Sequence, residues 1–149
     1  MNILFLDIDG PMIPARMYYD GIPKIITGKK ADVWMFDPLA VAMVNHLIDT
    51  FKIKLVFNTS HNALGIDHIL NFQYNGITRS DYHDDFMTKY PLGLTKRMDA
   101  ISEWLTRHPE VTKWVVLDDW PIESDRAVLV DYNYGITLDN FEQLVKLFK

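Results

Sequence analysis

The beginning of the chain decides the fold. A short apolar run leads into two aspartates and a glycine, Ile3-Leu4-Phe5-Leu6-Asp7-Ile8-Asp9-Gly10. The run is typical of a buried strand, in which alternate side chains point to opposite faces. Where the strand ends and the chain leaves the sheet, both carboxylates can turn toward one point. Because two such carboxylates repel each other unless a cation or a proton lies between them, this corner is a candidate for Mg²⁺ chemistry.

The composition fits a single domain over residues 1–149. Hydrophobic residues make up 48% of the chain, which is enough for a sizeable core and argues against disorder. No apolar stretch is long enough to span a bilayer, so no membrane association is expected. Cysteine is absent, which excludes disulfides and thiolate metal sites and favours a cytoplasmic protein. The net charge of -5 argues against a protein that coats nucleic acid non-specifically.

Strands and helices are predicted to alternate along the chain. Apolar runs predict strands at 3–6, 53–57, 76–78, 114–117 and 127–130, and helical spacing predicts helices at 38–51, 63–72, 96–107 and 138–148. Residues 79–95 are expected to form a loop. This alternation predicts an α/β fold of three layers, with a central parallel sheet between helices. In such a sheet the ligand binds at the carboxyl ends of the strands.

Residues 12–36 interrupt the alternation. Prolines and glycines break any long element there, although aromatic and β-branched residues allow a short hairpin. The stretch is shorter than the ~30 residues of a βαβ unit, so we expect a small flap rather than a second domain. Tyr18, Tyr19 and Trp34 are expected to pack this flap on the core, and stacking on a base is the alternative. A small flap would leave the site open to a large substrate or a partner chain.

Polar residues follow three of the predicted strands. They are Asp7 with Asp9, Thr59 with Ser60, and Asp118 with Asp119. Phosphoryl transfer needs a nucleophile, a proton-transfer group, a divalent ion and donors around the phosphoryl oxygens. Asp7 could attack phosphorus and form an aspartyl-phosphate, and Asp9 could protonate the leaving oxygen and later deprotonate water.

The remaining residues could complete such a site. Thr59, with Ser60 beside it, could hold a phosphoryl oxygen, and Lys96 could neutralise phosphate charge. Asp118 and Asp119 could form an oxygen-ligand Mg²⁺ site together with Asp7. Histidines show no metal-binding spacing, and we expect His61, His68, His83 and His108 at the surface, although His61 follows Thr59 and Ser60 closely and could touch substrate. Asp125 could support the site from behind or lie at the surface.

The order of these residues resembles the four motifs of the haloacid dehalogenase (HAD) superfamily. The motifs are Asp7-Ile8-Asp9-Gly10, Thr59, Lys96 and Asp118-Asp119. Residues 36–60 and 97–119 are similar to the small HAD domains of Swiss Army Knife RNA-repair proteins. The resemblance implies a Rossmann-like HAD fold, a Mg²⁺ cofactor and phosphatase activity through an aspartyl-phosphate. It also implies that Asp9 binds the metal through its backbone carbonyl.

The resemblance leaves two kinds of question open. Lys96 matches the superfamily pattern and Arg97 matches the nearer relatives, so both are candidates for binding phosphate. The chain also departs from its relatives at Pro11, where many have Thr or Val, and at His61 and Asn62, where the nearer relatives often have Trp and Arg. A proline at this turn fixes φ and removes an N–H.

We therefore expect a Mg²⁺-dependent phosphatase that acts on a phosphorylated substrate. A nucleotide or a nucleic-acid terminal phosphate is favoured by the RNA-repair relatives and by the open site. A sugar-phosphate or metabolite phosphatase is one alternative, and a non-catalytic module that binds phosphate or a partner is another. A response-regulator receiver is excluded, because its acidic pair comes early and its phosphorylated Asp comes mid-chain, where this chain has Asn58-Thr59-Ser60. The oligomeric state is not readable from the sequence.

Overall fold

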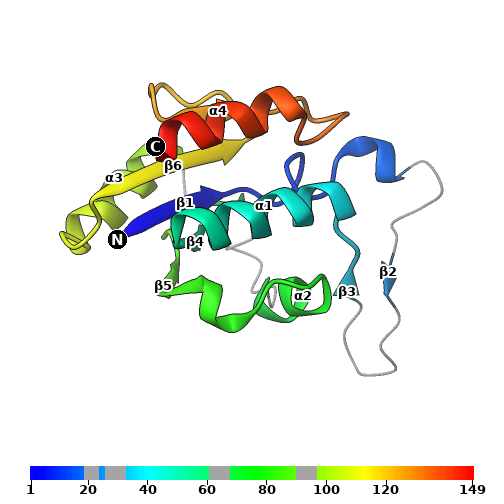
Figure 1. Cartoon of the computed structure of the whole chain (residues 1–149), viewed down its shortest axis with the longest axis horizontal. Helices are drawn as coiled ribbons and strands as arrows, with labels where there is room; N and C mark the ends of the chain where they lie inside the picture. Colours follow the sequence, from blue (N-terminus) through cyan, green and yellow to red (C-terminus); the bar gives the residue numbers. More distant parts are fainter. Residues whose placement is uncertain (19–23, 26–32, 61–67, 90–96) are drawn as a thin grey trace.

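The structure is a computed structural model that describes residues 1–18, 24–25, 33–60, 68–89 and 97–149. Its centre is a five-stranded parallel sheet (Figure 1). The strands lie in the order β5-β4-β1-β6-β7, and their bounds are β1 (Asn2–Leu6), β4 (Ile53–Phe57), β5 (Tyr82–Met87), β6 (Lys113–Asp118) and β7 (Ala127–Leu129). The predicted α/β fold with a central parallel sheet is confirmed.

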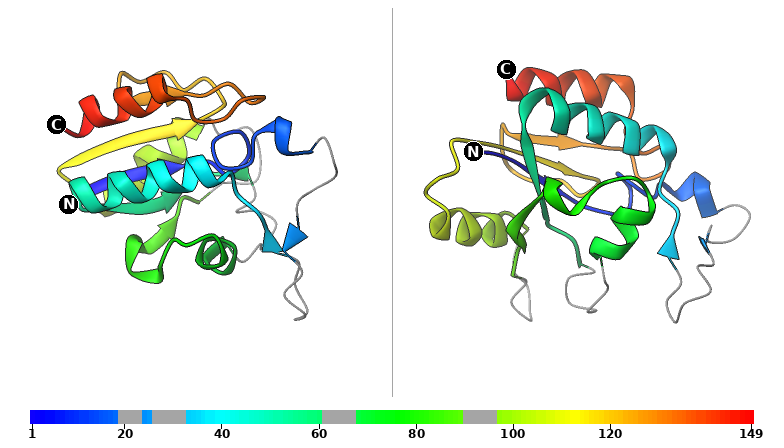
Figure 2. Two further views of the ribbon diagram at one scale, coloured as in Figure 1. Left: turned by 45° about the vertical axis from the view of Figure 1, so that its right-hand side comes forward. Right: turned by 60° about the horizontal axis from the view of Figure 1, so that its bottom comes forward.

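Helices cover both faces of the sheet. Their bounds are α1 (Pro38–Phe51), α2 (His68–Tyr74), α3 (Arg97–Arg107) and α4 (Leu138–Phe148). Figure 2 shows α1 and α4 side by side on one face and α3 on the other. The ring of Phe51 at the end of α1 stacks on that of Phe148 at the end of α4, with 5.8 Å between centroids. Within the described ranges, no helix is both long and apolar enough to cross a membrane.

The strands divide the core into two clusters. Leu4 and Leu6 of β1 face the cluster that includes α1, α2 and α4, whereas Ile3 and Phe5 face the cluster that includes α3. Phe5 meets Trp104 of α3 edge to face, with 5.3 Å between ring centroids. Because all of these side chains are buried, a slip of one residue in β1 would exchange its two faces, and the core therefore fixes the register.

This register determines what lies at the carboxyl edge of the sheet. Leu6, the last residue of β1, pairs with Phe57 on one side and Leu117 on the other. The next residues along the three strands, Asp7, Asn58 and Asp118, are therefore neighbours. The chain adds β4 and β5 on one side of β1 and then crosses to add β6 and β7 on the other. Asp7 and Asp118 consequently flank the point where the strand order reverses, which is where ligands bind in open α/β sheets.

The insertion after β1 contains the short hairpin that the sequence allowed. In the described residues of the insertion we find the helical turn η1 (Ala15–Tyr18) and two antiparallel strands, β2 (Lys24–Ile25) and β3 (Val33–Trp34). Tyr18 and Trp34 pack against the core, as predicted, and Tyr19 lies outside the described residues.

Two asparagines of the α2 region attach this insertion to the main body. The side chain of Asn71 accepts a hydrogen bond from the Trp34 N–H at 2.8 Å. Asn75 accepts from the Phe36 N–H at 2.7 Å and donates to the Trp34 carbonyl at 2.8 Å. Backbone groups that have no strand partner at this point are thus satisfied by side chains.

Two predicted elements are wrong. Residues 76–78 form no strand, because Gly76, with φ of +89°, turns the chain directly after α2. The third strand is instead β5, inside the stretch expected to be a loop. As an edge strand β5 has a polar sequence, and its pairing with β4 is irregular: Leu55 pairs with Tyr82, but Phe57 pairs with Met87. Both features hide the alternation that identifies a strand.

The other boundaries agree with the predictions to within a few residues. The helix predicted over 63–72 is seen as α2, and residues 63–67 lie outside the described ranges. The helix predicted from Lys96 is described from Arg97, and Lys96 is itself outside the described residues.

Asn75→Ala tests the attachment of the insertion. Because the change leaves the Phe36 N–H and the Trp34 carbonyl without these partners, we expect the free energy of unfolding to fall by about 2–3 kcal/mol. Urea unfolding followed by circular dichroism measures the loss. Gln73→Ala, on an exposed position of α2, is the matched control and should stay within about 0.5 kcal/mol of wild type. Equal stability of the two variants would contradict the role of Asn75.

Candidate active site

Three carboxylates meet at the carboxyl edge of the sheet. Asp7 follows β1, Asp118 ends β6 and Asp119 follows it, and each offers an oxygen within 4.8 Å of the other two. Asp7 and Asp118 are almost completely buried, with 2% and 1% of their surface exposed. Neighbouring buried carboxylates repel each other and lose their hydration, so this arrangement requires positive charge or protons.

Arg97 supplies part of that charge. Its Nη1 lies 2.5 Å from Asp7 Oδ2 and 2.5 Å from Asp118 Oδ2. Burial alone would lower the pKa of the guanidinium, but the charge of Asp7 and the hydrogen bond to Asp118 raise it above its ordinary value. Of the two basic candidates, Arg97 therefore lies among the acids, and Lys96 is outside the described residues.

Backbone groups hold two of the carboxylates in place. The Ile8 N–H donates to Asp7 Oδ1 at 2.8 Å, and the Trp120 N–H donates to Asp118 Oδ1 at 2.8 Å. Both donors come from the turns that directly follow the strands. The orientation of each carboxylate is therefore fixed by local structure, before any ligand binds.

Negative charge still exceeds positive charge in this cluster. Burial, and then the charge of Asp7, raise the pKa of Asp118 to about 7 although Arg97 opposes the rise. Burial, the charge of Asp7 and a hydrogen bond with Asp7 likewise raise the pKa of Asp119 to about 6. A further cation would favour the ionised forms of Asp118 and Asp119. Closely spaced carboxylate oxygens are the donor set that Mg²⁺ prefers, so these residues fit the metal that the resemblance implies.

Asp9 lies outside this close group of acids. Its side chain makes a hydrogen bond with the hydroxyl of Tyr18, on η1. Burial and the charge of Asp9 raise the pKa of Tyr18 to about 12, so the phenol is a hydrogen-bond donor. Hydrogen bonds also hold η1 in place, because the N–H groups of Ala15 and Arg16 donate to the carbonyls of Tyr132 and Asn133. The sequence signal for Tyr18 was only its place in the flap, which gave no reason to pair it with Asp9.

The second motif lies at the end of β4. Thr59 is buried and Ser60 is exposed, both beside the strand end that neighbours Asp7. Asn58 is completely buried; its Oδ1 accepts from the Thr88 hydroxyl at 2.8 Å, and its Nδ2 has no hydrogen-bond partner among the residues that the structure describes. Sequence reasoning did not single out Asn58, although the strand alternation gives it the same face as Asp7.

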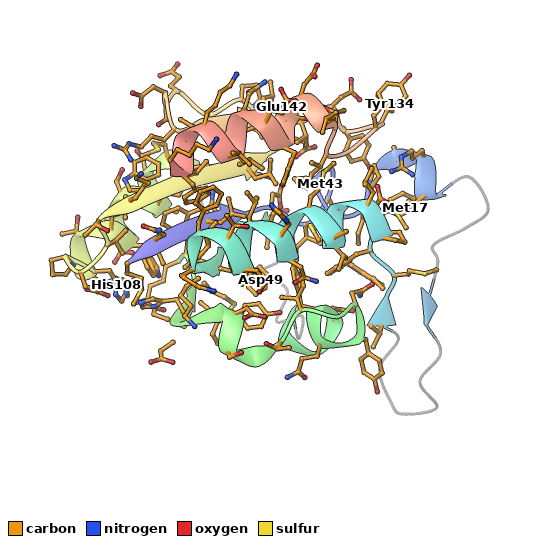
Figure 3. All side chains as sticks on the ribbon, viewed as in Figure 1. Met17, Met43, Asp49, His108, Tyr134 and Glu142 are labelled. Carbon is orange, nitrogen blue, oxygen red and sulfur yellow. The ribbon has the colours of Figure 1, made fainter. Side chains whose placement is uncertain are left out.

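A second group of possible metal ligands lies elsewhere. His83, His108 and Glu110 come together near the amino ends of the strands, and Figure 3 shows His108 far from Met17 and Tyr134. The expectation that His83 is a surface residue is wrong, because its ring is packed edge to face on Trp104. The Asp85 N–H donates to His83 Nδ1 at 3.0 Å, so Nε2 carries the proton of the neutral ring. A metal at Nε2 would require an imidazolate or the loss of this hydrogen bond, so this group fits a hydrogen-bond network better than a metal site.

Gly10 makes the approach of Asp119 possible. Its φ is +79°, and a Cβ at this position would lie 2.5 Å from Asp119 Cβ. We expect Gly10→Ala to combine backbone strain with displacement of Asp119. Gly76 has φ of +89° with open space around it, so Gly76→Ala isolates the strain.

We predict that Gly10→Ala and Gly76→Ala differ in their free energy of unfolding. Strain of about 1–2 kcal/mol is expected in Gly76→Ala, and Gly10→Ala should lose a further ~1–3 kcal/mol of unfolding free energy through the clash. Thermal and urea unfolding of both variants measure it. If Gly10→Ala were no less stable than Gly76→Ala, the close packing of Gly10 on Asp119 would be refuted.

Comparison with known proteins agrees with this geometry. The model of one family, described as the HAD domain in Swiss Army Knife RNA repair proteins, matches residues 3–141. Searches of curated proteins and of solved structures gave no match. The matched range covers all of the sheet except Asn2, and it includes every residue of the acid cluster. The chain therefore belongs to the family of HAD domains found in Swiss Army Knife RNA repair proteins.

Proposed function

We propose that this protein is a Mg²⁺-dependent phosphatase that hydrolyses phosphate monoesters through an aspartyl-phosphate on Asp7. One observation carries the proposal: Asp7, Asp118 and Asp119 offer oxygens within 4.8 Å of one another, with the Arg97 guanidinium between two of them. The family match supports a phosphatase-like domain, and the chemistry that follows is our inference.

Asp7 is the proposed nucleophile. The Ile8 N–H on Oδ1 and Arg97 on Oδ2 hold its carboxylate in one orientation. One Asp7 oxygen attacks phosphorus, the bond between phosphorus and the ester oxygen breaks, and the leaving oxygen takes a proton from Asp9. Water then attacks phosphorus, gives its proton to Asp9 and releases inorganic phosphate with Asp7 restored. The hydrogen bond from Tyr18 keeps the Asp9 carboxyl in a fixed orientation for both proton transfers.

The metal and the phosphate donors complete the proposal. Asp7, Asp118, Asp119 and the Asp9 carbonyl would hold Mg²⁺, which when bound supplies positive charge for the acids and for a phosphoryl oxygen. Arg97, Thr59, Ser60 and Lys96 are the proposed phosphate-binding residues. Because Arg97 is held by Asp7 and Asp118, its positive charge lies beside the atom that would attack phosphorus.

The proposed substrates are nucleotides or nucleic-acid terminal phosphates, in line with the RNA-repair proteins whose domain matches the chain. A phosphatase of small metabolite phosphates is the alternative on the same chemistry. A non-catalytic phosphate-binding module is a third candidate, and it would follow if the ion pairs of Arg97 kept a metal from Asp7 and Asp118. The cytosolic location stays a prediction that depends on the absence of cysteine.

Activity on p-nitrophenyl phosphate separates an enzyme from a module. With Mg²⁺ we expect turnover by the wild type, a loss of at least about 10³-fold in Asp7→Asn, and a loss of about 10²–10⁴-fold in Asp9→Asn. Asp125→Asn is the matched control, because Asp125 is exposed and lies outside the acid cluster. A panel of mononucleotides, sugar phosphates and 3′- or 5′-phosphorylated oligonucleotides then identifies the substrate class. A well-folded wild type that turns over no member of the panel would contradict the enzyme.

Metal binding has a signature that does not depend on activity. Because Asp118 and Asp119 have raised pKa values when folded but ionise near pH 4 when unfolded, the folded state binds more protons between about pH 4 and pH 7. Without metal, their contribution to stability therefore falls as the pH rises through this range. Mg²⁺ favours the ionised folded form, so it should raise Tm more at pH 8 than at pH 5.

Differential scanning fluorimetry with and without MgCl₂ measures this shift. Asp119→Asn should reduce the Mg²⁺-dependent rise at pH 8, and Asp125→Asn should leave it unchanged. An equal rise at both pH values would indicate that Mg²⁺ acts elsewhere than on these carboxylates.

A further inference from the structure

A cavity of about 370 Å³ adjoins the acid cluster. It lies between the first turn of α3 and the loop that follows β6, and its lining residues are Arg97, Met98, Asp99, Trp120, Pro121, Ile122 and Glu123. Arg97, which is one of the lining residues, also contacts Asp7 and Asp118 through its guanidinium. A substrate with its phosphoryl group at Asp7 would therefore have the cavity available for the rest of the molecule. The volume is near the lower end of small-ligand pockets, which is enough for one small group.

The apolar wall of this cavity is preformed. Met98 and Ile122 pack against the core cluster beneath α3. Trp120 is different, because 64% of its surface is exposed although indole is largely apolar. Its backbone is fixed by the N–H bond to Asp118, and further along the loop the Ser124 N–H donates to the Ile122 carbonyl at 2.8 Å. The exposed indole, on a backbone held in this way, offers a flat surface on which an aromatic ring can stack.

The charges of the cavity restrict what can occupy it. Asp99 and Glu123 line it and are exposed, and the positive charge of Arg97 is already shared between Asp7 and Asp118. A second phosphate in this cavity would be repelled by Asp99 and Glu123. A neutral ring with N–H donors would instead find an aromatic face and two carboxylate acceptors.

We propose that this cavity binds the base of a nucleoside monophosphate, with Trp120 stacked on the ring and Glu123 or Asp99 accepting from its exocyclic amino group. This proposal rests on the phosphatase function above and narrows it from nucleotides and nucleic-acid ends to single nucleotides with one phosphate. The size of the cavity and its two acids both oppose a polynucleotide, which carries further phosphates beside the terminal one.

The test compares four substrates on the full chain with Mg²⁺. They are cytidine 5′-monophosphate, uridine 5′-monophosphate, ribose 5-phosphate and cytidine 3′,5′-bisphosphate. We expect the highest kcat/KM for cytidine monophosphate, a lower value for uridine monophosphate, which lacks the amino group, and lower values still for the other two. Trp120→Leu should raise KM for cytidine monophosphate at least about 5-fold with little change in kcat. Glu123→Gln should reduce the preference for cytidine over uridine, and Tyr74→Leu, an exposed aromatic on α2, is the control that should match wild type.

The outcomes separate this proposal from the proposed function. If the esters are hydrolysed equally well with and without a base, and Trp120→Leu changes nothing, the cavity proposal is overturned while the phosphatase stands. Faster turnover of a phosphorylated oligonucleotide than of the mononucleotide also overturns it. If no ester is hydrolysed, the phosphatase fails, and calorimetric titration of cytidine monophosphate decides the cavity alone. Binding that Trp120→Leu weakens would support it, and absent or unchanged binding would refute it.

Discussion

The structure depends on the burial of two neighbouring carboxylates. The core fixes the register of β1 between β4 and β6, and that register makes Asp7 and Asp118 neighbours at the edge where three strands end. Neither can move into water without disturbing strands whose apolar residues are buried on both faces. Their repulsion is therefore built into the fold, and it must be relieved by what surrounds them. Arg97, the backbone donors and the raised pKa of Asp118 are all responses to this one constraint.

This constraint also explains how the proposed site would work. A cluster with excess negative charge does not attract a phosphate dianion, so the proposed chemistry needs a cation that the acids hold and that the phosphoryl group can share. Arg97 belongs to both parts of this scheme, because its guanidinium stabilises the acids and the residue is among those that line the adjoining cavity. The chain that follows β1 supports the same group of acids. Gly10 permits the close approach of Asp119, and η1 places Tyr18 beside Asp9.

Sequence reasoning predicted the parts that follow from strand ends. Asp7 and the Asp118–Asp119 pair come directly after apolar runs, Thr59 comes one residue later than such a run, and the parallel sheet brings these positions to one edge. β5 was missed because an irregular edge strand needs little apolar alternation. Lys96 and Arg97 are adjacent, so the choice between them depends on where side chains point at the start of α3, which residue types alone do not determine. The sequence did not predict the contact between Tyr18 and Asp9. Irregular backbone brings these two residues together, and it leaves no periodic pattern in the sequence. Trp120 had a signal that could have been used, since it is a large apolar residue directly after Asp118-Asp119, in a stretch with a proline and several polar residues.

The central claim is that Asp7 receives the phosphoryl group beside a cation held by the other acids. A crystal structure of the protein grown with MgCl₂ and beryllium fluoride tests both parts at once, because trifluoroberyllate bonded to a carboxylate mimics an aspartyl-phosphate. The account predicts beryllium bonded to an Asp7 carboxylate oxygen, with Mg²⁺ bound to Asp7 and to at least one of Asp118 and Asp119. Trifluoroberyllate on another residue, or Mg²⁺ bound away from these three carboxylates, would contradict it.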